Sequence, residues 1–424
     1  MASFTKSFKN TGYLQSSLNL GLFFLSWGIW WSFFQLWLKS PIEDGGLAFN
    51  NTQVGTLYSV NSLATLILMF IYGTVQDRLG YKRTMQIIIA AMSALVAPFM
   101  IWVYEPLLKS NYMLGVVVGA IVLSAGFMAG VGLLEALAER FSRRYNFEYG
   151  QARMWGSFGY AIAALIAGFL FNIDPHYNFW VGSAIGVVNL LLVVLWKAPV
   201  PAGEKDLTAQ EKASQPGIRE MVGLLRMPSL WLIIVFVLFS WTFYTVFDQQ
   251  MFPDFYVGLF ETAEAGNRTY GILNSVQVFA EAAMMGVIPI VMRKVGVRTT
   301  LLMGVTVMSL RILGCAVFSD PIAVSCVKML HAIEVPLFIL PIFRYFTLHF
   351  NPMLSATLYM VGFQIAAQVG NVILSPVLGA LNDSRGYHFT FVVIAAIVAL
   401  SGVYAFFTLK KDDQQVLGDP FVRS

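Results

Sequence analysis

The chain has 424 residues, of which 57% are hydrophobic and only 12% are charged, and its formal net charge is +4. This composition excludes a string of soluble domains, because too few polar residues remain to cover their surfaces. Apolar stretches of about 20 residues, the length that crosses a bilayer core, recur along the whole sequence. The small net charge, with no basic tail or stripe, gives nucleic-acid binding no support. Cys315 and Cys326 both lie in apolar segments, where we expect small core residues and neither a disulfide nor a metal site.

The N-terminal segment carries Lys6 and Lys9 ahead of a hydrophobic stretch that is too long for a signal peptide. No small-residue cleavage site follows this stretch. We therefore expect the first helix to remain in the mature protein.

Apolar runs between charged or Pro/Gly-rich breaks predict the helices of the membrane domain. Six are predicted in the first half of the chain, at 13–38, 52–73, 84–104, 113–138, 146–171 and 178–196. Six more are predicted at 229–251, 269–291, 300–318, 321–345, 355–380 and 387–409. The polar stretch 197–227 lies near the midpoint and is interpreted as a cytoplasmic linker. The sequence predicts an all-α integral membrane protein with 12 transmembrane helices, in six-helix bundles at 1–196 and 228–424.

Basic residues are distributed unequally between alternate loops. With the N-terminus inside, 20 of the 27 Lys and Arg residues lie on the side of the termini or at the helix ends that face it, and Arg153, Arg311 and Lys328 lie deeper within predicted spans. The opposite side holds only Lys39, Lys109, Arg268 and Arg385. By the positive-inside rule, both termini are predicted to be cytoplasmic.

A weak internal repeat relates the two halves. The segment GTVQDRLGYKR at 73–83 follows the second predicted helix, and PIVMRKVGVR at 289–298 follows the eighth. The first copy, with Asp77, Arg78 and Gly80, resembles the signature loop of the major facilitator superfamily. A generic Gly/Arg turn is the alternative reading.

Three polar residues stand out within the spans of the N-terminal half. An ionisable side chain inside a bilayer costs roughly 2.5–3.5 kcal/mol, so it usually faces a cavity and has a partner. Glu135 lies on the fourth predicted helix and Arg153 on the fifth, with Tyr160 on nearly the same face as Arg153. Glu135 and Arg153 could bind hydroxyl groups, or they could form a purely structural ion pair.

The C-terminal half holds more polar residues within its predicted spans. They are Tyr244 and Asp248 on the seventh helix, Asn274, Gln277 and Glu281 on the eighth, Arg311 on the ninth, Lys328, His331 and Glu334 on the tenth, and Gln364, Gln368 and Asn371 on the eleventh. Such stripes on apolar helices are typical of an aqueous cavity, and contacts between helices are the alternative. His331 has no second histidine nearby and no nucleophile, so neither a metal site nor an enzyme is indicated.

Several sequence blocks are more specific than the signature loop. They are YEPLL (104–108), SRRYNFEYGQARMWGSFGY (142–160), FDQQMFP (247–253), LRILG (310–314) and KMLHAIEVP (328–336). With these blocks the chain resembles the oligosaccharide:proton symporters, the lactose permease group, over essentially its whole length. Within that group it is most similar to the sucrose permease branch.

The resemblance implies a role for each polar residue. Glu135 and Arg153 are expected to bind sugar hydroxyls, and Tyr160 to stack on a sugar ring. Gln277, Glu281 and His331 are expected to complete the binding site. The resemblance further implies that Arg311 and Glu334 couple transport to a proton, with His331 nearby, and that Asp248 pairs with Lys328.

The chain also departs from the lactose permeases. Those proteins carry Trp at the position of Tyr160, and an Asp–Lys pair at the positions of Thr245 and Ala367. The sugar-binding carboxylate of the eighth helix is displaced from Val278 to Glu281. These departures resemble the sucrose permeases, so sucrose is the favoured substrate, while raffinose, melibiose, maltose and lactose stay open.

The predicted activity is import of a disaccharide together with a proton by alternating access, with no cofactor beyond the proton. We expect the protein to lie in the lipid of a bacterial inner membrane and to transport as a monomer. An exporter of amphipathic small molecules is the alternative, but it favours an aromatic cavity with few hydroxyl-binding groups. A non-transporting sugar sensor would normally need an appended soluble domain.

Overall fold

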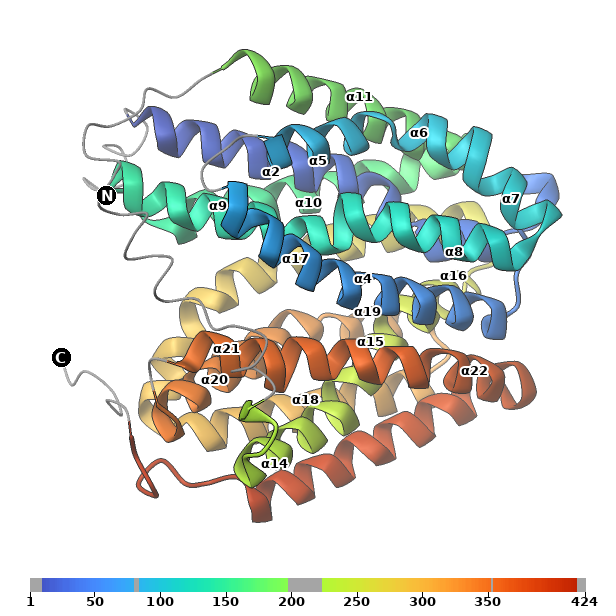
Figure 1. Ribbon diagram of the computed structural model, residues 1–424. Helices are drawn as coiled ribbons and strands as arrows, with labels where there is room; N and C mark the ends of the chain where they lie inside the picture. The colour runs from blue at the N-terminus through green and yellow to red at the C-terminus, as the bar shows by residue number, and fades with distance from the viewer. Residues whose placement is uncertain (1–9, 80–83, 197–222, 352–353, 418–424) are drawn as a thin grey trace. The chain divides into compact units, whose positions relative to one another are not determined.

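The computed structural model describes residues 10–79, 84–196, 223–351 and 354–417, and the regular elements in these ranges are helical (Figure 1). Residues 80–83 of the predicted signature loop, and 197–222 of the predicted linker, lie outside the described residues. The side chains of 73–79, including Asp77 and Arg78, are likewise outside the description.

The chain divides into two compact units. The first comprises Met1–Phe49, Val60–Gln215 and Thr262–Val278, and the second comprises Asn50–Ser59, Pro216–Glu261 and Phe279–Ser424. Two long helices are shared between the units. Helix α4 (Asn51–Leu79) begins in the second unit and continues in the first, whereas α17 (Ala263–Val295) begins in the first and continues in the second.

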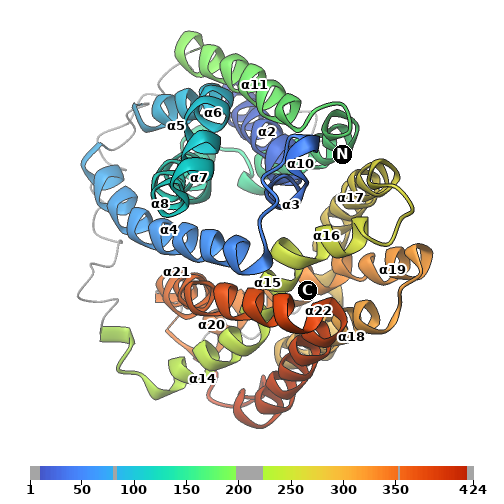
Figure 2. The same ribbon diagram turned by 90° about the vertical axis from the view of Figure 1, so that its right-hand side faces the viewer.

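The first unit is arranged around α2. Besides parts of α4 and α17 it contains α2 (Thr11–Trp31), α3 (Phe34–Lys39), η1 (Ile42–Asp44), α5 (Thr84–Ala94), α6 (Val96–Phe99), η2 (Met100–Tyr104), α7 (Glu105–Ser110), α8 (Tyr112–Leu123), η3 (Ser124–Met128), α9 (Ala129–Tyr145), α10 (Tyr149–Phe171) and α11 (Pro175–Leu195). Helix α2 packs against both α10 and α11 (Figure 2). Small residues permit the close approach: a Cβ atom on Gly159 would lie 2.3 Å from the carbonyl oxygen of Gly21.

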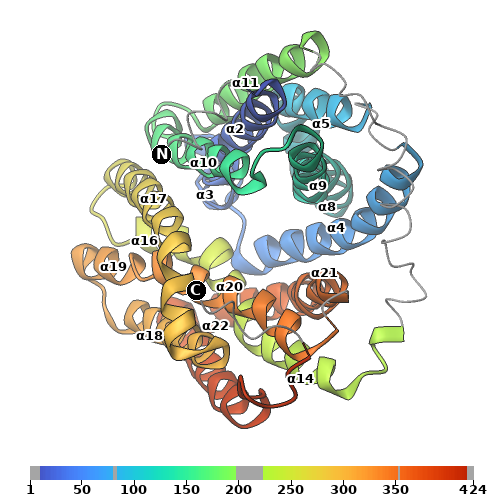
Figure 3. The same cartoon turned by 90° about the vertical axis from the view of Figure 1, so that its left-hand side faces the viewer.

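The second unit is arranged around α18. Besides parts of α4 and α17 it contains α14 (Pro228–Val237), η4 (Leu238–Thr242), α15 (Phe243–Val246), η5 (Phe247–Met251), α16 (Phe252–Val257), α18 (Val297–Val317), α19 (Pro321–Lys328), α20 (His331–His349), α21 (Ser355–Tyr359), η7 (Met360–Ile365) and α22 (Ala366–Thr408). Helix α18 packs against α20 and α22 (Figure 3). Segments η4, η5 and η7 are π-helical and interrupt longer α-helical spans.

Several helices begin with side-chain caps that the sequence supplies directly. Asn10 accepts hydrogen bonds from the backbone N–H groups of Gly12 and Tyr13 at the start of α2. Asp174 and Asp320 cap α11 and α19, and in each case a proline occupies the first helical position. Caps of this kind satisfy N–H groups that have no partner within the helix.

Length and composition identify nine membrane-spanning helices among the described residues, or ten if the pair Thr84–Ala94 and Val96–Ser110, bent by 56°, counts as one span. The stretch Thr357–Thr408 contains two of the twelve predicted spans, because the chain turns at Gly386, where φ is +78°. Helix α2 falls outside this set, and its first turns carry buried Gln15, Ser16 and Asn19. Each of the twelve predicted spans coincides with helix in the structure.

Two details of the sequence prediction were wrong. The second and fourth helices were predicted to end at 73 and 138, but α4 and α9 continue to Leu79 and Tyr145. The prediction stopped where the apolar run stopped, although helical hydrogen bonding continues beyond it. Cys326 is exposed and not a core residue, unlike the buried Cys315.

Candidate functional site

A salt bridge joins the two charged residues that the sequence singles out in the first unit. Arg153 on α10 donates from Nε to Oε1 of Glu135 on α9 over 2.5 Å, and each side chain is 31% exposed. The second carboxylate oxygen and the remaining guanidinium N–H groups give the pair further hydrogen-bonding capacity. A partly exposed carboxylate beside a guanidinium can therefore accept from one hydroxyl group and donate to another.

Neighbouring residues fix the position of Arg153. Its guanidinium lies 4.4 Å from the centre of the Phe24 ring, and its Nη1 lies 3.4 Å from the hydroxyl of Ser157, one turn further along α10. Tyr160 follows two turns after Arg153 and lies against α2 at Gly28. A Cβ atom at Gly28 would come within 2.9 Å of the Tyr160 ring. The pair and the aromatic ring thus lie along one side of α10.

In the second unit, Asp248 is surrounded by two cations and an imidazole. Its Oδ1 lies 2.8 Å from Nζ of Lys328, 3.0 Å from Nη1 of Arg311 and 3.5 Å from Nδ1 of His331. Asp248 belongs to the π-helical segment η5, a distortion of the kind found at functional sites. The resemblance to the symporters implied the pairing of Lys328 with Asp248, and the structure confirms it, but nothing in the sequence indicated that Arg311 shares the same oxygen.

Arg311 also contacts a second carboxylate. Its Nε lies 2.9 Å from Oε2 of Glu334 and its Nη2 lies 2.7 Å from Oε1, and both side chains are fully buried. Two carboxylates, Asp248 and Glu334, therefore balance the two cations Arg311 and Lys328. Such balance is required because an unpaired charge is strongly disfavoured in a buried position.

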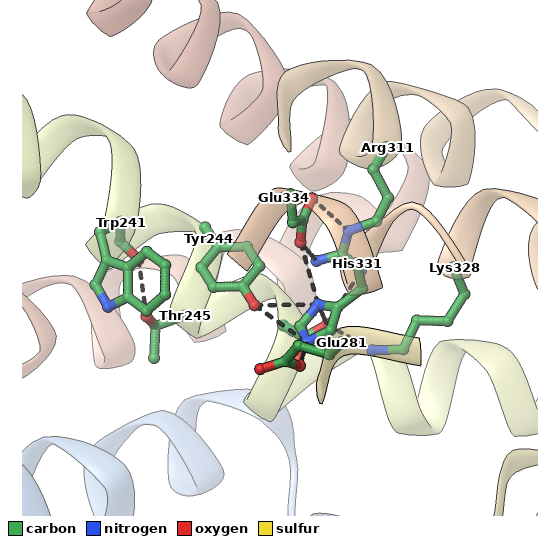
Figure 4. A network of polar contacts seen from close by, with 9 residues as sticks. Trp241, Tyr244, Thr245, Glu281, Arg311, Lys328, His331 and Glu334 are labelled. Atoms are coloured by element: carbon green, nitrogen blue, oxygen red, sulfur yellow. Dashed lines mark hydrogen bonds and ion pairs between the residues drawn. The ribbon is translucent and has the colours of Figure 1, made fainter. Parts of the chain in front are cut away.

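His331 connects this charge cluster to two further polar groups. Its Nδ1 lies 3.1 Å from Oε1 of Glu334 and 3.0 Å from the hydroxyl of Tyr244, and its Nε2 lies 3.9 Å from Oε2 of Glu281 (Figure 4). Tyr244 on α15, Glu281 on α17 and Glu334 on α20 converge on the imidazole of His331. The imidazole of His331 therefore lies between the carboxylates of Glu281 and Glu334 and can transmit a displacement of one to the other.

Two further predicted residues, Asn274 and Gln277, lie on α17 before Glu281, in the part of this helix that belongs to the first unit. Both are buried. Glu281 and the other predicted residues of the C-terminal half belong to the second unit.

Thr245 and Ala367, at the two positions where the lactose permeases carry a charge pair, are neutral residues, and the hydroxyl of Thr245 has a hydrogen-bond partner. The hydroxyl of Thr245 donates to the carbonyl oxygen of Trp241 over 2.7 Å, within its own helix (Figure 4). Ala367 is buried. Neither residue requires a charged partner.

The sequence of this chain is similar to those of known sugar permeases. Residues 5–420 match the family model described as the LacY proton/sugar symporter. The chain belongs to this proton/sugar symporter family. It is 43% identical to the sucrose permease of Escherichia coli over 412 residues, which cover 97% of this chain and 96% of the relative. It is a transporter and not an enzyme.

Other members of the symporter family are also similar. The raffinose permease of Escherichia coli is 33% identical over 404 residues, covering 95% of this chain and 93% of the relative. The melibiose permease of Enterobacter cloacae is 35% identical over 390 residues, covering 92% and 90%. Among solved structures, the nucleoside transporter NupG matches with a TM-score of 0.76 at 15% identity, over 94% of this chain and 100% of that chain. This likeness shows the fold alone, that of the major facilitator transporters.

Two residues that contact Arg153, Ser157 and Phe24, were not singled out in the sequence. Ser157 could have been found, because it lies four residues after Arg153 on the same helix. Phe24 could not, since it is one of 35 phenylalanines and lies on a different helix.

Proposed function

We propose that this protein imports a disaccharide together with a proton, with sucrose as the first candidate, by alternating access. The observation that carries the proposal is the pairing of Glu135 with Arg153, both partly exposed, with Tyr160 two turns after Arg153 on α10. Sugars present many hydroxyl groups and an apolar ring face, so they require charged hydrogen-bonding partners and an aromatic surface. Relatives named as sucrose and melibiose permeases support a disaccharide as the substrate, and a relative named as a raffinose permease extends the range to a trisaccharide.

In this proposal Glu334 carries the coupled proton. Protonation removes the negative charge that binds Arg311, and loss of the proton restores the ion pair. The buried Arg311–Glu334 pair supports this assignment, because such a pair has two alternative arrangements that differ by one proton. His331 contacts Glu334, and its Nε2 lies 3.9 Å from Oε2 of Glu281, so occupation of the sugar site could influence the proton site.

The remaining features of the proposal concern the setting of the protein. We assign it to a bacterial inner membrane with both termini in the cytoplasm, from the unequal distribution of basic residues between loops. Residues 1–196 and 228–424 would be the two repeated bundles, joined by the linker 197–227. A monomer binds the disaccharide and the coupled proton, with no further cofactor.

A panel of sugars tests the proposal. Cells that express the protein, suspended in weakly buffered medium, receive sucrose, raffinose, melibiose, maltose or lactose, and the pH of the medium is followed. Proton-coupled import alkalinises the medium on addition of a transported sugar, with sucrose expected to give the largest signal. Cells that carry the empty vector are the control. If none of the five sugars changes the pH or accumulates in the cells, the proposal is wrong and export of amphipathic compounds becomes the better assignment.

A further inference from the structure

The carboxylate of Asp383 accepts four hydrogen bonds from the beginning of α4. Oδ1 accepts from the backbone N–H of Asn51 over 2.9 Å and from its side-chain Nδ2 over 2.8 Å. Oδ2 accepts from the backbone N–H of Thr52 over 2.7 Å and from its hydroxyl over 2.6 Å. Asp383 lies on α22, just before the turn at Gly386, and all of these residues belong to the second unit.

These bonds are not needed to start α4. Asn50 and Gln53 already form a local cap, in which the Gln53 N–H donates to Oδ1 of Asn50 over 2.8 Å and the Asn50 N–H donates to Oε1 of Gln53 over 3.0 Å. Reciprocal bonds of this kind stabilise a helix start without outside help. Asp383 comes from a segment more than 300 residues away in the chain. Its contribution is therefore to hold two helices together.

The contact between α4 and α22 continues for two further turns. A Cβ atom at Gly55 would lie 2.2 Å from the carbonyl oxygen of Ser375, so the two backbones touch there. One turn further, the hydroxyl of Ser59 donates to the carbonyl oxygen of Val372 over 2.5 Å. Asp383 itself is exposed at the end of this contact. Water can therefore replace its four bonds if the helices separate.

A second polar contact supports the same end of the unit. The hydroxyl of Tyr387 on α22 donates to a carboxylate oxygen of Asp254 on α16, and it lies 3.3 Å from Oδ1 of Asn51. Asn51 is thus held by both Asp383 and Tyr387.

We propose that Asp383 is a latch that holds α4 against α22 and closes this end of the transport path, and that it must release α4 each time the path opens there. The inference rests on the proposed function, since it assumes that the protein works by alternating access. Hydrogen bonds to a carboxylate are stronger than those between neutral groups, so loss of this charge favours the open state.

The reactivity of a cysteine in the latched contact tests the proposal. Ser59→Cys is introduced together with Cys326→Ser, while the fully buried Cys315 is retained, and the double variant is the parent. A membrane-impermeant maleimide is applied to vesicles in which this end of the protein faces outward. Asp383→Asn is expected to raise the labelling rate of residue 59 by about fivefold or more, within the usual range of coupling between two conformational states. Thr52→Val removes one of the four donors and should give a smaller increase.

Asp320→Asn is the matched control, because Asp320 also caps a helix start with its carboxylate but bonds only within its own segment. Its labelling rate should equal that of the parent. If Asp383→Asn and Thr52→Val also label at the parent rate, the latch does not exist. If Asp383→Asn fails to fold, Thr52→Val alone decides.

The labelling requires no sugar and can be read whatever the substrate is. A parent that transports disaccharides while both variants label at the parent rate would overturn the latch and leave the proposed function intact. Faster labelling in the variants of a protein that transports none of the five sugars would support the latch and overturn the substrate assignment.

Discussion

Arg311 binds both oxygens of Glu334 at once, with Nε 2.9 Å from Oε2 and Nη2 2.7 Å from Oε1, and neither side chain is exposed. In the proposed cycle this arrangement corresponds to the state in which Glu334 has released its proton. The resemblance to the symporters implied that Arg311 and Glu334 take part in proton coupling, without indicating this direct contact.

Glu334→Gln and Glu334→Ala should uncouple sugar movement from the proton. A permanently neutral side chain cannot release a proton, so steps that require deprotonation are blocked. The sugar-loaded carrier should still change conformation. We expect sugar binding and equilibrium exchange to persist, while uphill accumulation and alkalinisation of the medium are lost. Counterflow and uphill uptake in membrane vesicles measure both, and the exposed Glu264→Gln is the control. Uphill uptake that survives in Glu334→Gln would rule out the coupling role.

Glu135→Gln and Arg153→Lys should each weaken sugar binding. A hydrogen bond to a charged group contributes about 1.5–3 kcal/mol, so the affinity should fall roughly 10- to 100-fold. The unfolding temperature should change little, because both side chains are 31% exposed and such pairs contribute little stability. Titration calorimetry gives the affinity. Glu148→Gln, at the exposed start of α10, should bind normally, and near-normal affinity in both pair variants would show that the salt bridge is only structural.

Tyr160 should act through its ring. Tyr160→Phe and Tyr160→Trp are expected to retain transport, whereas Tyr160→Ala should lose most of it, because stacking depends on the aromatic surface. Uptake of radiolabelled sugar measures this. If Tyr160→Ala transports as well as the unaltered protein, a stacking role for Tyr160 is excluded.

Gly28→Ala offers an independent test of the same ring. The added Cβ would lie 2.9 Å from the Tyr160 ring and 3.0 Å from Cβ of Ala163, so the ring must move and transport should fall. At Gly21, on the same helix, the nearest atom would lie 3.5 Å away, which is an ordinary contact. Gly21→Ala should therefore transport normally. Equal uptake by the two variants would indicate that the position of Tyr160 is unimportant.

Removal of Asp248 should destabilise the protein more than removal of Lys328. Asp248→Asn leaves buried Lys328 without its carboxylate and Arg311 with only Glu334, and breaking a buried pair in this way costs about 3–5 kcal/mol. Lys328→Met leaves Asp248 with Arg311 at 3.0 Å. The double variant Asp248→Asn/Lys328→Met should recover part of the loss.

Thermal unfolding in detergent, without sugar, measures this order. Lys109→Met is the control, because Lys109 is 45% exposed and its salt bridge to Glu105 should contribute at most about 1 kcal/mol. Equal unfolding temperatures for Asp248→Asn and Lys328→Met would contradict the shared contact of Arg311 with Asp248.

The sequence by itself determined where the helices lie and to which family the chain belongs. A helix satisfies its backbone hydrogen bonds locally, and a bilayer requires a long apolar run for each span, so both properties can be read from neighbouring residues. The same reasoning located Glu135, Arg153, Asp248 and Glu334, because a charge within an apolar run is conspicuous. The exact ends of the helices could not be predicted in this way, because α4 and α9 continue beyond their apolar runs.

The tertiary structure alone decided the contacts of Arg311 and Asp383. Arg311 contacts Asp248, 63 positions away, and Glu334, 23 positions away, while Asp383 reaches Asn51 across 332 positions. Such contacts depend on how each helix is rotated and packed against its neighbours. The π-helical segments change that rotation within a span, so the 3.6-residue period no longer predicts the direction of side chains beyond them. No local pattern in the sequence encodes this rotation.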